Sequence, residues 1–162
     1  MDKKQNVLDT LKNMDIPYEL MEHPAVYTID EMIALELPHK EWVVKNLFLR
    51  DAKGKRHFLV VLSQEKTADL KQLRQEIGCT ALSFASEERL MRYLGLTKGA
   101  VTPFGILNDA EHAVEVVLDS DLAGRQRIGV HPNVNTATVY LSYESLLRVF
   151  RELDVPYSLA AL

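Results

Sequence analysis

Residues 42–50, Trp-Val-Val-Lys-Asn-Leu-Phe-Leu-Arg, predict a β-strand at the centre of the fold. The side chains of a strand alternate between its two faces, and both faces here carry apolar residues, which is typical of a strand covered on each side. Lys45 and Asn46 lie in the middle of this strand and point in opposite directions. Desolvating a lysine costs several kcal/mol unless its charge meets an anion. Lys45 therefore either extends past the edge of the sheet to water or is present because it binds a ligand.

A hairpin and further elements are expected around this strand. Residues 51–55 have the composition of a turn, and the apolar run at 57–63 follows them as a second strand. Shorter strands are expected at 17–21, 81–84, 113–118, 127–131 and 136–141. Helices are expected, from apolar spacing and capping residues, at 3–14, 29–37, 70–77, 87–94 and 143–153. Interleaved helices and strands with hairpin and crossover connections predict an α/β (α+β) fold, one domain over residues 1–162, with a mixed, curled β-sheet surrounded by helices.

A short motif occurs near both ends of the chain. Residues 14–20 are Met-Asp-Ile-Pro-Tyr-Glu-Leu, and residues 153–159 are Leu-Asp-Val-Pro-Tyr-Ser-Leu. Each copy follows a predicted helix, so we expect the same exit from a helix into an extended segment at both places. Two short copies do not make a repeat architecture, and we interpret the motif as structural.

Length and composition restrict the class of protein. A chain of 162 residues fits one domain. It has no run of about 18 apolar residues, so no membrane-spanning helix is expected, and its N-terminal sequence lacks an apolar signal segment. The single cysteine, Cys79, allows no internal disulfide and fits a reducing compartment. The expected location is the cytoplasm, with no membrane partner.

The charge of the chain is unevenly distributed. The net charge is −4, which argues against a general nucleic-acid binder. Residues 40–98, however, hold twelve Lys and Arg against seven Asp and Glu, and the remainder holds seven against sixteen. The basic middle of the chain either contacts a phosphate-bearing partner or is a solvated surface.

Common catalytic motifs are absent from the sequence. The histidines at 23, 39, 57, 112 and 131 and the lone cysteine have no zinc-ligand spacing, so no metal is expected. There is no Gly-x-Ser-x-Gly elbow, no P-loop and no dinucleotide fingerprint. Cys79 has no neighbouring base, and we interpret it as a packing thiol.

Two further segments are candidates for a site. The loop at 99–103, Gly-Ala-Val-Thr-Pro, can present backbone N–H groups to a carbonyl or an oxyanion, or it is a structural loop. His131 precedes a proline and is either a surface or capping histidine or a ligand-binding residue. With Lys45, these segments describe a pocket that has a cation, backbone donors and a polar histidine but no evident nucleophile.

These residues resemble the YbaK/ProX-type aminoacyl-tRNA deacylases, which are related to the editing domain inserted in bacterial prolyl-tRNA synthetases. The resemblance extends over essentially the whole chain, in order. It is carried by Val44-Lys45-Asn46-Leu47-Phe48-Leu49, Gly99-x-x-x-Pro103-Phe104-Gly105, His131-Pro132-Asn133 with 135–138, and Glu22-His23-Pro24 with Tyr27-Thr28. The histidine-containing segment is most similar to the free-standing ProX branch, which clears alanine from proline tRNA.

The resemblance implies trans-editing, namely hydrolysis of the ester between alanine and mischarged proline tRNA. It implies no metal or cofactor and no covalent enzyme intermediate. The implied partner is tRNA, with prolyl-tRNA synthetase as a second partner, and whether the synthetase delivers the substrate stays open. Contacts with tRNA are expected on the basic region 40–98.

The resemblance also implies roles for individual residues. The implied catalytic residues are Lys45, Asn46 and His131. Substrate-binding residues are expected to be Gly99, Ala100, Val101, Thr102, Pro103, Gly105, Tyr27, Thr28 and Met32. Met32 and Ile33 of the helix at 29–37 are expected to form the wall that excludes proline, because selectivity for a smaller amino acid requires a second, tighter pocket.

Two alternatives remain at this point. The first keeps the fold but changes the substrate to tRNA charged with cysteine or serine, which a panel of mischarged tRNAs would separate. The second is a non-catalytic module that senses an amino acid or aminoacyl group and releases no free amino acid.

Overall fold

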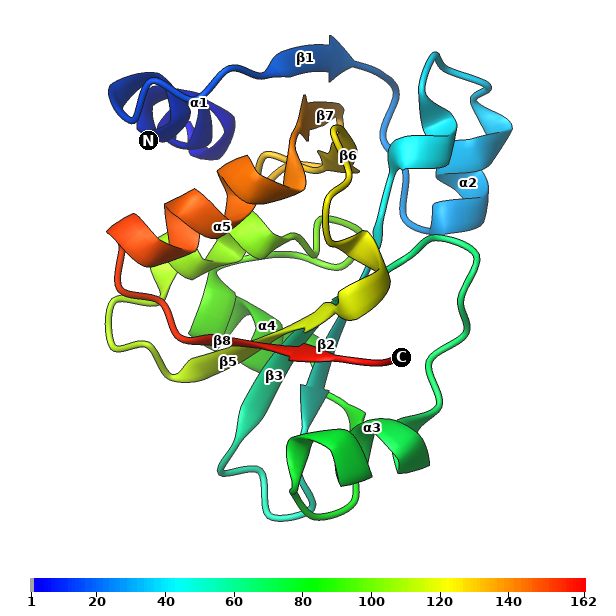
Figure 1. The fold of residues 1–162 in the computed structure, drawn as a ribbon, viewed down its shortest axis with the longest axis vertical. Helices are drawn as coiled ribbons and strands as arrows, with labels where there is room; N and C mark the ends of the chain where they lie inside the picture. The colour runs from blue at the N-terminus through cyan, green and yellow to red at the C-terminus, as the bar shows by residue number, and fades with distance from the viewer. Residues whose placement is uncertain (1) are drawn as a thin grey trace.

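The strands form two sheets over residues 2–162, the part of the chain that this computed structural model describes (Figure 1). The five-stranded sheet has the order β4-β2-β3-β5-β8, and the three-stranded sheet has the order β1-β7-β6. The strands are β1 (Glu19–Glu22), β2 (Lys45–Arg50), β3 (His57–Leu62), β4 (Ser83–Phe84), β5 (Val114–Asp119), β6 (Ile128–Val130), β7 (Ala137–Leu141) and β8 (Tyr157–Ala160). The helices are α1 (Lys3–Asn13), α2 (Ile29–Ala34), α3 (Leu70–Ile77), α4 (Glu87–Leu94) and α5 (Tyr143–Glu152), with 3₁₀ turns η1 (Lys40–Trp42), η2 (Pro103–Asn108) and η3 (Ser120–Leu122).

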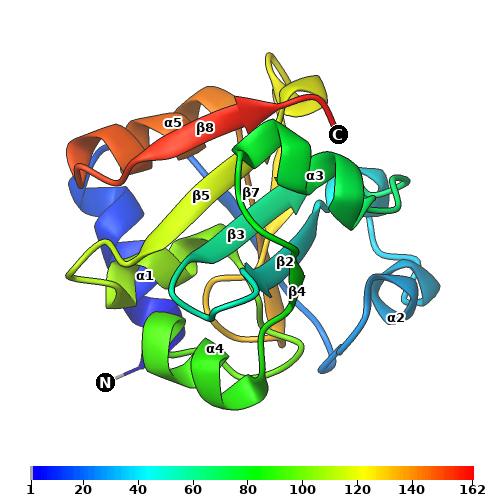
Figure 2. The ribbon, with the colours of Figure 1, turned by 90° about the horizontal axis from the view of Figure 1, so that it is seen from below.

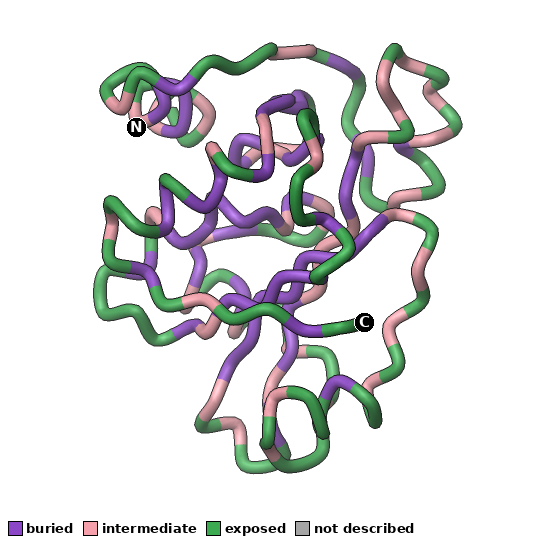
Figure 3. Tube along the Cα trace, in the orientation of Figure 1, coloured by how far each residue is buried: buried purple, intermediate pink, exposed green. Residues whose placement is uncertain are grey.

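The predicted hairpin lies inside the five-stranded sheet. β2 and β3 pair antiparallel along their whole lengths, whereas β3 and β5, and β5 and β8, pair parallel. The apolar side chains of β3 alternate between two clusters, with Leu59 and Val61 in the larger cluster and Phe58, Val60 and Leu62 in the smaller one. Figure 3 shows the buried chain running through this central hairpin. A mixed sheet covered on both faces is therefore confirmed.

Helices cover the two faces of this sheet. α1, α4 and α5 contribute to the larger cluster, and α3 packs against the smaller one (Figure 2). Each helix begins after a side chain that accepts a backbone N–H, namely Asp2, Thr28, Asp69, Ser86 or Ser142. Such caps satisfy donors that the first turn of a helix leaves free. No helix within residues 2–162 is long and apolar enough to cross a membrane.

The start of β2 differs from the prediction. Residues 40–42 form the 3₁₀ turn η1, and the strand begins at Lys45 rather than Trp42. His39 has a φ of 64°, and its ring stacks on the Trp42 indole with centroids 3.9 Å apart, which favours a compact turn over extended backbone. Val43 then forms a parallel bridge with Gly129 of β6. Lys45 is consequently the first residue of the strand and not its middle.

The end of α2 also differs from the prediction. The helix ends at Ala34 rather than at residue 37, and Glu36 has a left-handed φ of 52°. Pro38 disfavours helical backbone at the residue before it, so a turn separates the helix from the proline. The loop over residues 35–39 brings the chain back toward β2.

The curled sheet of the prediction is divided in two. The three-stranded sheet meets the first sheet at the Val43–Gly129 bridge, where the Val44 N–H also donates to the Gly129 carbonyl at 3.1 Å. This junction brings the start of β2 beside the end of β6. Lys45 and His131, which are far apart in sequence, thereby come to line the same cavity.

Candidate active site

A cavity of about 250 Å³ lies between α2, the start of β2, the loop after α4 and the end of β6. Figure 1 shows α2 beside the start of β2, at one end of the molecule. The lining residues are Val26, Tyr27, Thr28, Ile29, Met32, Val43, Val44, Lys45, Asn46, Leu47, Gly99, Val101, Gly129, Val130 and His131. All three residues proposed as catalytic therefore line one cavity, together with five of the nine proposed for substrate binding.

Lys45 is held by a neutral group. Its Nζ donates to the Lys66 carbonyl oxygen at 2.5 Å, and the side chain is half-buried. Within residues 2–162 no carboxylate lies within 4 Å of this ammonium. The positive charge is oriented but not neutralised, and it is available to a ligand in the cavity.

A buried ion pair fixes the carbonyl that holds Lys45. The Lys66 ammonium lies 2.9 Å from Asp119 and 2.6 Å from Asp121, and it donates to the Leu162 carbonyl at 2.7 Å. The hydrogen bond with Asp121 and the contact with Asp119 raise the pKa of Lys66. Asp119, fully buried at the end of β5, also accepts the Ser63 N–H. Sequence reasoning missed this support because its members are far apart in the chain.

Asn46 follows Lys45 and also lines the cavity. Its Oδ1 atom is buried and has no hydrogen-bond partner within residues 2–162. Buried polar atoms of folded proteins are nearly always paired. This oxygen can therefore accept a hydrogen bond from a hydroxyl or ammonium group of a bound ligand.

His131 presents a nitrogen acceptor toward the cavity. Its Nδ1 lies 2.8 Å from the Ala137 carbonyl oxygen, which can only accept, so Nδ1 carries the proton. Burial lowers the pKa of His131, and the neighbouring His23 lowers it further against the opposing effect of the Ala137 hydrogen bond. The neutral ring therefore persists at pH 7 with a free lone pair on Nε2.

His23 supports His131 and was not among the predicted site residues, although it lies in a segment that carries the family resemblance. Its ring is buried 5.9 Å from the His131 ring, between centroids. Its Nδ1 donates to the Pro24 carbonyl at 2.8 Å, and its Nε2 lies 2.9 Å from the Thr138 hydroxyl. Both nitrogens of His23 are thus occupied, which fits a residue that orders the site rather than one that binds a ligand.

The loop after α4 contributes two residues to the cavity lining, Gly99 and Val101. Gly99 has a φ of 89°, and a Cβ there would lie 2.8 Å from the Tyr27 ring, so this position requires glycine. The other loop residues proposed for substrate binding are buried and lie outside the lining: Ala100, Thr102, Pro103 and Gly105. Their packing shapes the loop instead.

Two hydrogen bonds join this loop to the segment that follows His131. The Thr102 hydroxyl donates to the His131 carbonyl at 2.5 Å, and Asn133 donates to the Phe104 carbonyl at 3.3 Å. Gly105 allows the loop to approach Leu94 and Leu96, because a Cβ there would lie 2.8 Å from Leu96. The loop and the histidine consequently keep a fixed relative position.

The expected cradle of consecutive amides is interrupted. The Ala100 N–H donates to Thr97 within the loop, and Pro103 has no N–H. In the described chain, residues 2–162, the amides of Gly99, Val101 and Thr102 donate to no protein acceptor. Of these, only the amides of Gly99 and Val101 belong to residues that line the cavity, and they are the donors that the loop can offer to a carbonyl oxygen.

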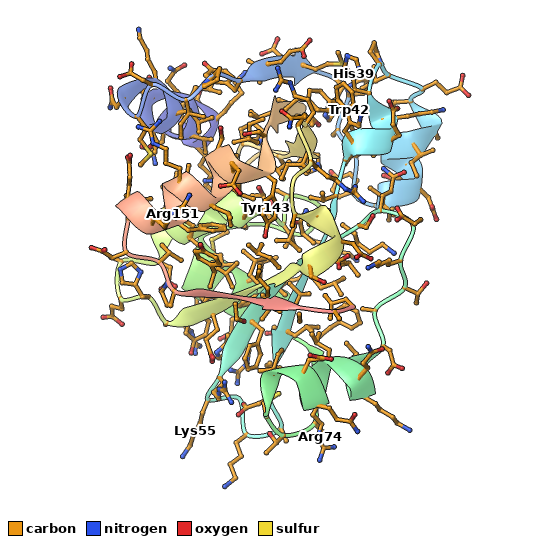
Figure 4. All side chains as sticks on the ribbon, in the orientation of Figure 1. His39, Trp42, Lys55, Arg74, Tyr143 and Arg151 are labelled. Atoms are coloured by element: carbon orange, nitrogen blue, oxygen red, sulfur yellow. The ribbon has the colours of Figure 1, made fainter. Side chains whose placement is uncertain are left out.

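The wall of the cavity is mostly apolar. Met32 of α2 is buried and lies in it, as expected, but the neighbouring lining residue of that helix is Ile29 rather than Ile33. Ile29 and Met32 are three positions apart and line the cavity together, whereas Ile33 is partly buried outside the lining. Figure 4 shows His39 and Trp42 close to α2, where their stacked rings brace the chain that enters β2.

Comparison with known proteins identifies the family. The aminoacyl-tRNA editing domain matches residues 23–149. The chain belongs to this family. It is 54% identical over 151 residues to the prolyl-tRNA editing protein ProX of Acetoanaerobium sticklandii, covering 93% of this chain and 92% of that protein. It is also 36% identical over 155 residues to the prolyl-tRNA synthetase associated domain-containing protein 1 of Danio rerio, covering 94% and 83%.

The fold has a counterpart among solved structures. A protein described as a candidate trans-editing enzyme for prolyl tRNA synthetase superposes with a TM-score of 0.75 at 22% identity, covering 100% of this chain and 97% of that one. The resemblance to the YbaK/ProX-type editing fold is confirmed. Editing of an aminoacyl-tRNA is hydrolysis of its ester bond, so the chain is a hydrolase, as the resemblance implied, and its substrate includes tRNA.

Proposed function

We propose that the chain is a trans-editing aminoacyl-tRNA deacylase that hydrolyses the ester of alanine mischarged on proline tRNA. The observation that carries this proposal is the small cavity in which Lys45, Asn46, His131 and unpaired loop amides come together. A volume of about 250 Å³ lies just below the range of about 300–1,000 Å³ that is usual for ligand pockets, which favours a small acyl group. The substrate of a tRNA-editing enzyme is used in the cytoplasm, which agrees with the expected location.

The proposed reaction begins with the ester carbonyl at the loop. The free amides of Gly99 and Val101 are the donors for the charge that develops on the carbonyl oxygen. Removing one such donor costs other hydrolases about a hundredfold or more in rate. Lys45 adds a positive charge to the lining of the cavity, where it binds the terminal adenosine end or supports the same oxygen.

His131 orders the attacking water or the substrate in this proposal. Its free Nε2 accepts a hydrogen bond from water or from the ribose hydroxyl, and the Asn46 oxygen accepts from the α-ammonium group. The water oxygen forms a bond to the carbonyl carbon, and the bond from that carbon to the ribose oxygen breaks. The proton released by the water passes to the ribose oxygen, for which the neighbouring ribose hydroxyl is the relay.

Selectivity against proline is assigned to the wall formed by Ile29, Met32 and Val44. Packed interiors resist extra volume, and forcing additional methylene groups into them costs about 1–3 kcal/mol. Alanine fits such a space with little contact, whereas the proline ring meets the wall. Cysteine and serine are close to alanine in size, so they are the alternative substrates. The proposed second partner is prolyl-tRNA synthetase, as the source of the mischarged tRNA.

A panel of charged tRNAs tests this function. We expect release of free alanine from alanyl-tRNA(Pro) to be at least about tenfold faster than release of cysteine, serine or proline from the same tRNA. Faster release of cysteine or serine would reassign the substrate. Failure to release any amino acid would support a sensing module instead.

The Lys45→Ala variant tests the role of the strand lysine. We expect a loss of at least about a hundredfold in the rate of deacylation with an unchanged circular dichroism spectrum, because the variant removes a charge from the site and not from the core. Lys12→Ala, on the exposed face of α1, is the matched control and should retain full activity. A fully active Lys45→Ala variant would contradict the proposed role.

A further inference from the structure

Five cations gather at the end of the five-stranded sheet opposite the cavity, on elements that also carry the acidic residues Asp51, Glu76, Glu87 and Glu88. The β2–β3 hairpin turn, the adjoining face of α3 and the start of α4 bring together five cations, Arg50, Lys53, Lys55, Arg74 and Arg89. Figure 4 shows Lys55 and Arg74 projecting from this end of the molecule, far from His39 and Trp42. We call these five residues the basic end.

The cations of the basic end are not neutralised by carboxylates. Within residues 2–162 none of the five forms an ion pair. Asp51, in the hairpin turn, accepts the backbone N–H groups of Lys55 and Arg56 and forms no ion pair with a cation of this end. Glu115 is likewise paired with Arg56, at 2.8 Å.

Two arginines of the basic end converge on one point. The Nη2 atoms of Arg50 and Arg89 would each lie 2.9 Å from a Cβ placed on Gly54, at the tip of the hairpin. Both are held by neutral carbonyls: Arg50 donates to Ala52 at 3.2 Å and Arg89 to Gly54 at 3.1 Å. Two guanidinium groups held together without a carboxylate repel one another, and an anion between them would relieve that repulsion.

The spacing between the basic end and the cavity fits a nucleic acid. Lys45 and Arg50 are the first and last residues of β2, and five steps along a strand span about 17 Å. One strand of a nucleic-acid helix has a phosphate about every 3.4 Å along its axis, so this distance corresponds to about five nucleotides. That is the reach from the aminoacylated terminal nucleotide of a tRNA to the start of its acceptor stem.

We propose that the basic end binds the phosphate backbone of the tRNA acceptor stem while the aminoacylated 3′ end occupies the cavity. The proposal rests on the proposed function. The remainder of the chain is acidic and repels a polyanion, so this end orients the tRNA as well as holding it. Contacts of this kind are independent of base sequence and depend strongly on salt.

The test compares two variants of equal charge on two substrates. The variant Lys53→Glu with Lys55→Glu reverses two exposed cations of the basic end, and Lys12→Glu with Arg151→Glu makes the same change in charge on α1 and α5. The substrates are alanyl-tRNA(Pro) and the alanine ester of adenosine, which has no acceptor stem. Circular dichroism checks that both variants fold.

We expect the hairpin variant to raise KM for alanyl-tRNA(Pro) by about tenfold or more and to leave hydrolysis of the adenosine ester unchanged. The association constant of uncharged tRNA decreases as the salt concentration rises. For the hairpin variant, the slope of log K against log salt should be smaller in magnitude by about 2 than for the α1/α5 variant, because two phosphate contacts are lost. Equal effects of the two variants on alanyl-tRNA(Pro), or equal losses on both substrates, would overturn the proposal. If the unaltered protein hydrolyses neither substrate, the proposed function itself has failed, whereas hydrolysis of both with no difference between the variants rejects only the basic end.

Discussion

The surroundings of His131 fix both the tautomer and the charge of its ring. Its protonated Nδ1 is fixed by the Ala137 carbonyl, and burial lowers its pKa from the ordinary value of 6.5. Both effects come from neighbours that are supplied by the fold. The sequence shows only a histidine followed by a proline, which is why it left a surface histidine and a ligand-binding histidine equally open.

The pH dependence of deacylation should report this state. The lowered pKa means that His131 stays a neutral acceptor as the pH falls through 6.5 and becomes protonated only below that value. We expect the ratio of the rate of the unaltered protein to that of His131→Gln to stay constant between pH 7.5 and 6.5 and to decrease below it. Deacylation time courses across this range measure the ratio. A decrease that begins above pH 6.5 would contradict the assigned state.

Lys45 and Asn46 show what a strand pattern can and cannot specify. The alternation of side chains along residues 42–50 predicted that Lys45 and Asn46 lie in a strand with apolar neighbours, and both residues are in β2. It placed them in mid-strand, whereas the structure places Lys45 first in β2, after a turn stabilised by the stacked rings of His39 and Trp42. The stack depends on the left-handed backbone of His39, which no periodicity indicates.

At the scale of elements, the turn after β3 connects several strands to the site. Lys66 in this turn holds Lys45 through its carbonyl, and its ammonium contacts Asp119 at the end of β5 and the carbonyl of Leu162. The backbone carbonyl and the side chain of this one residue thus tie β2, β5 and the C-terminal residue together. The position of the Lys45 ammonium depends on all of them.

Lys66→Met should therefore affect both stability and activity. It leaves the Asp119 carboxylate buried without its cation, which we expect to cost about 2–3 kcal/mol, somewhat less than for a fully buried pair because Lys66 is partly exposed. The rate of deacylation should also decrease, because the carbonyl that orients Lys45 loses its support. Urea denaturation and a deacylation time course measure the two effects.

Lys71→Met on the exposed surface of α3 is the control for that variant. Lys71 forms no side-chain hydrogen bond or ion pair within residues 2–162, so its loss should change stability by about 0.5 kcal/mol or less. Equal stability of the two variants would show that the Asp119 pair contributes nothing.

The helix exits show an element that the sequence did predict. After α1 and after α5 the chain turns through a left-handed aspartate, Asp15 with φ 54° and Asp154 with φ 56°. The following N–H then bonds back to the helix, from Ile16 to Leu11 at 2.9 Å and from Val155 to Phe150 at 2.8 Å. The repeated motif predicted this shared exit, which is confirmed. It did not indicate that β1 and β8 join different sheets.

At the scale of the whole molecule, a buried histidine couples stability to pH. His57 begins β3 and is 1% exposed, and its Nε2 lies 2.9 Å from Arg89 of α4. Burial lowers its pKa, and the charges of Arg89, Arg50 and Arg92 lower it further against the opposing effect of Asp51. The unfolded chain binds a proton at this histidine at a higher pH than the folded chain does.

The folded state should therefore lose stability as the pH falls below 6.5, the ordinary pKa, until the folded-state pKa is reached. We expect the decrease in Tm between pH 7 and pH 5 to be smaller for His57→Gln than for the unaltered protein. Thermal unfolding at several pH values measures the change of Tm with pH. A loss of stability that is the same at every pH does not alter this change, so the substitution itself does not affect the comparison. Identical slopes would contradict the role of His57. The Tm of the His57→Gln variant should still decrease somewhat between pH 7 and pH 5, because burial also lowers the pKa of His131.

Local structure was predictable from the amino-acid sequence, and so were residues that line the cavity, among them Lys45, Gly99 and His131. Capping residues, glycines after helices and alternating apolar residues act over a few positions, so they predicted the helices and most strands to within a few residues. The motifs around Lys45, Gly99 and His131 predicted the family for the same reason, because each is a continuous segment.

The way in which these segments meet depends on contacts between residues far apart in the chain. The split into two sheets, the Val43–Gly129 bridge and the support of Lys45 by Lys66 and Asp119 join residues far apart in the chain. The sequence likewise did not indicate that the Ala100 N–H donates to the Thr97 carbonyl and is therefore not free to bind a ligand. This hydrogen bond depends on how the loop folds back on itself. Short-range preferences act along the chain, whereas a cavity is set by contacts across it, and those contacts exist only once the core has packed.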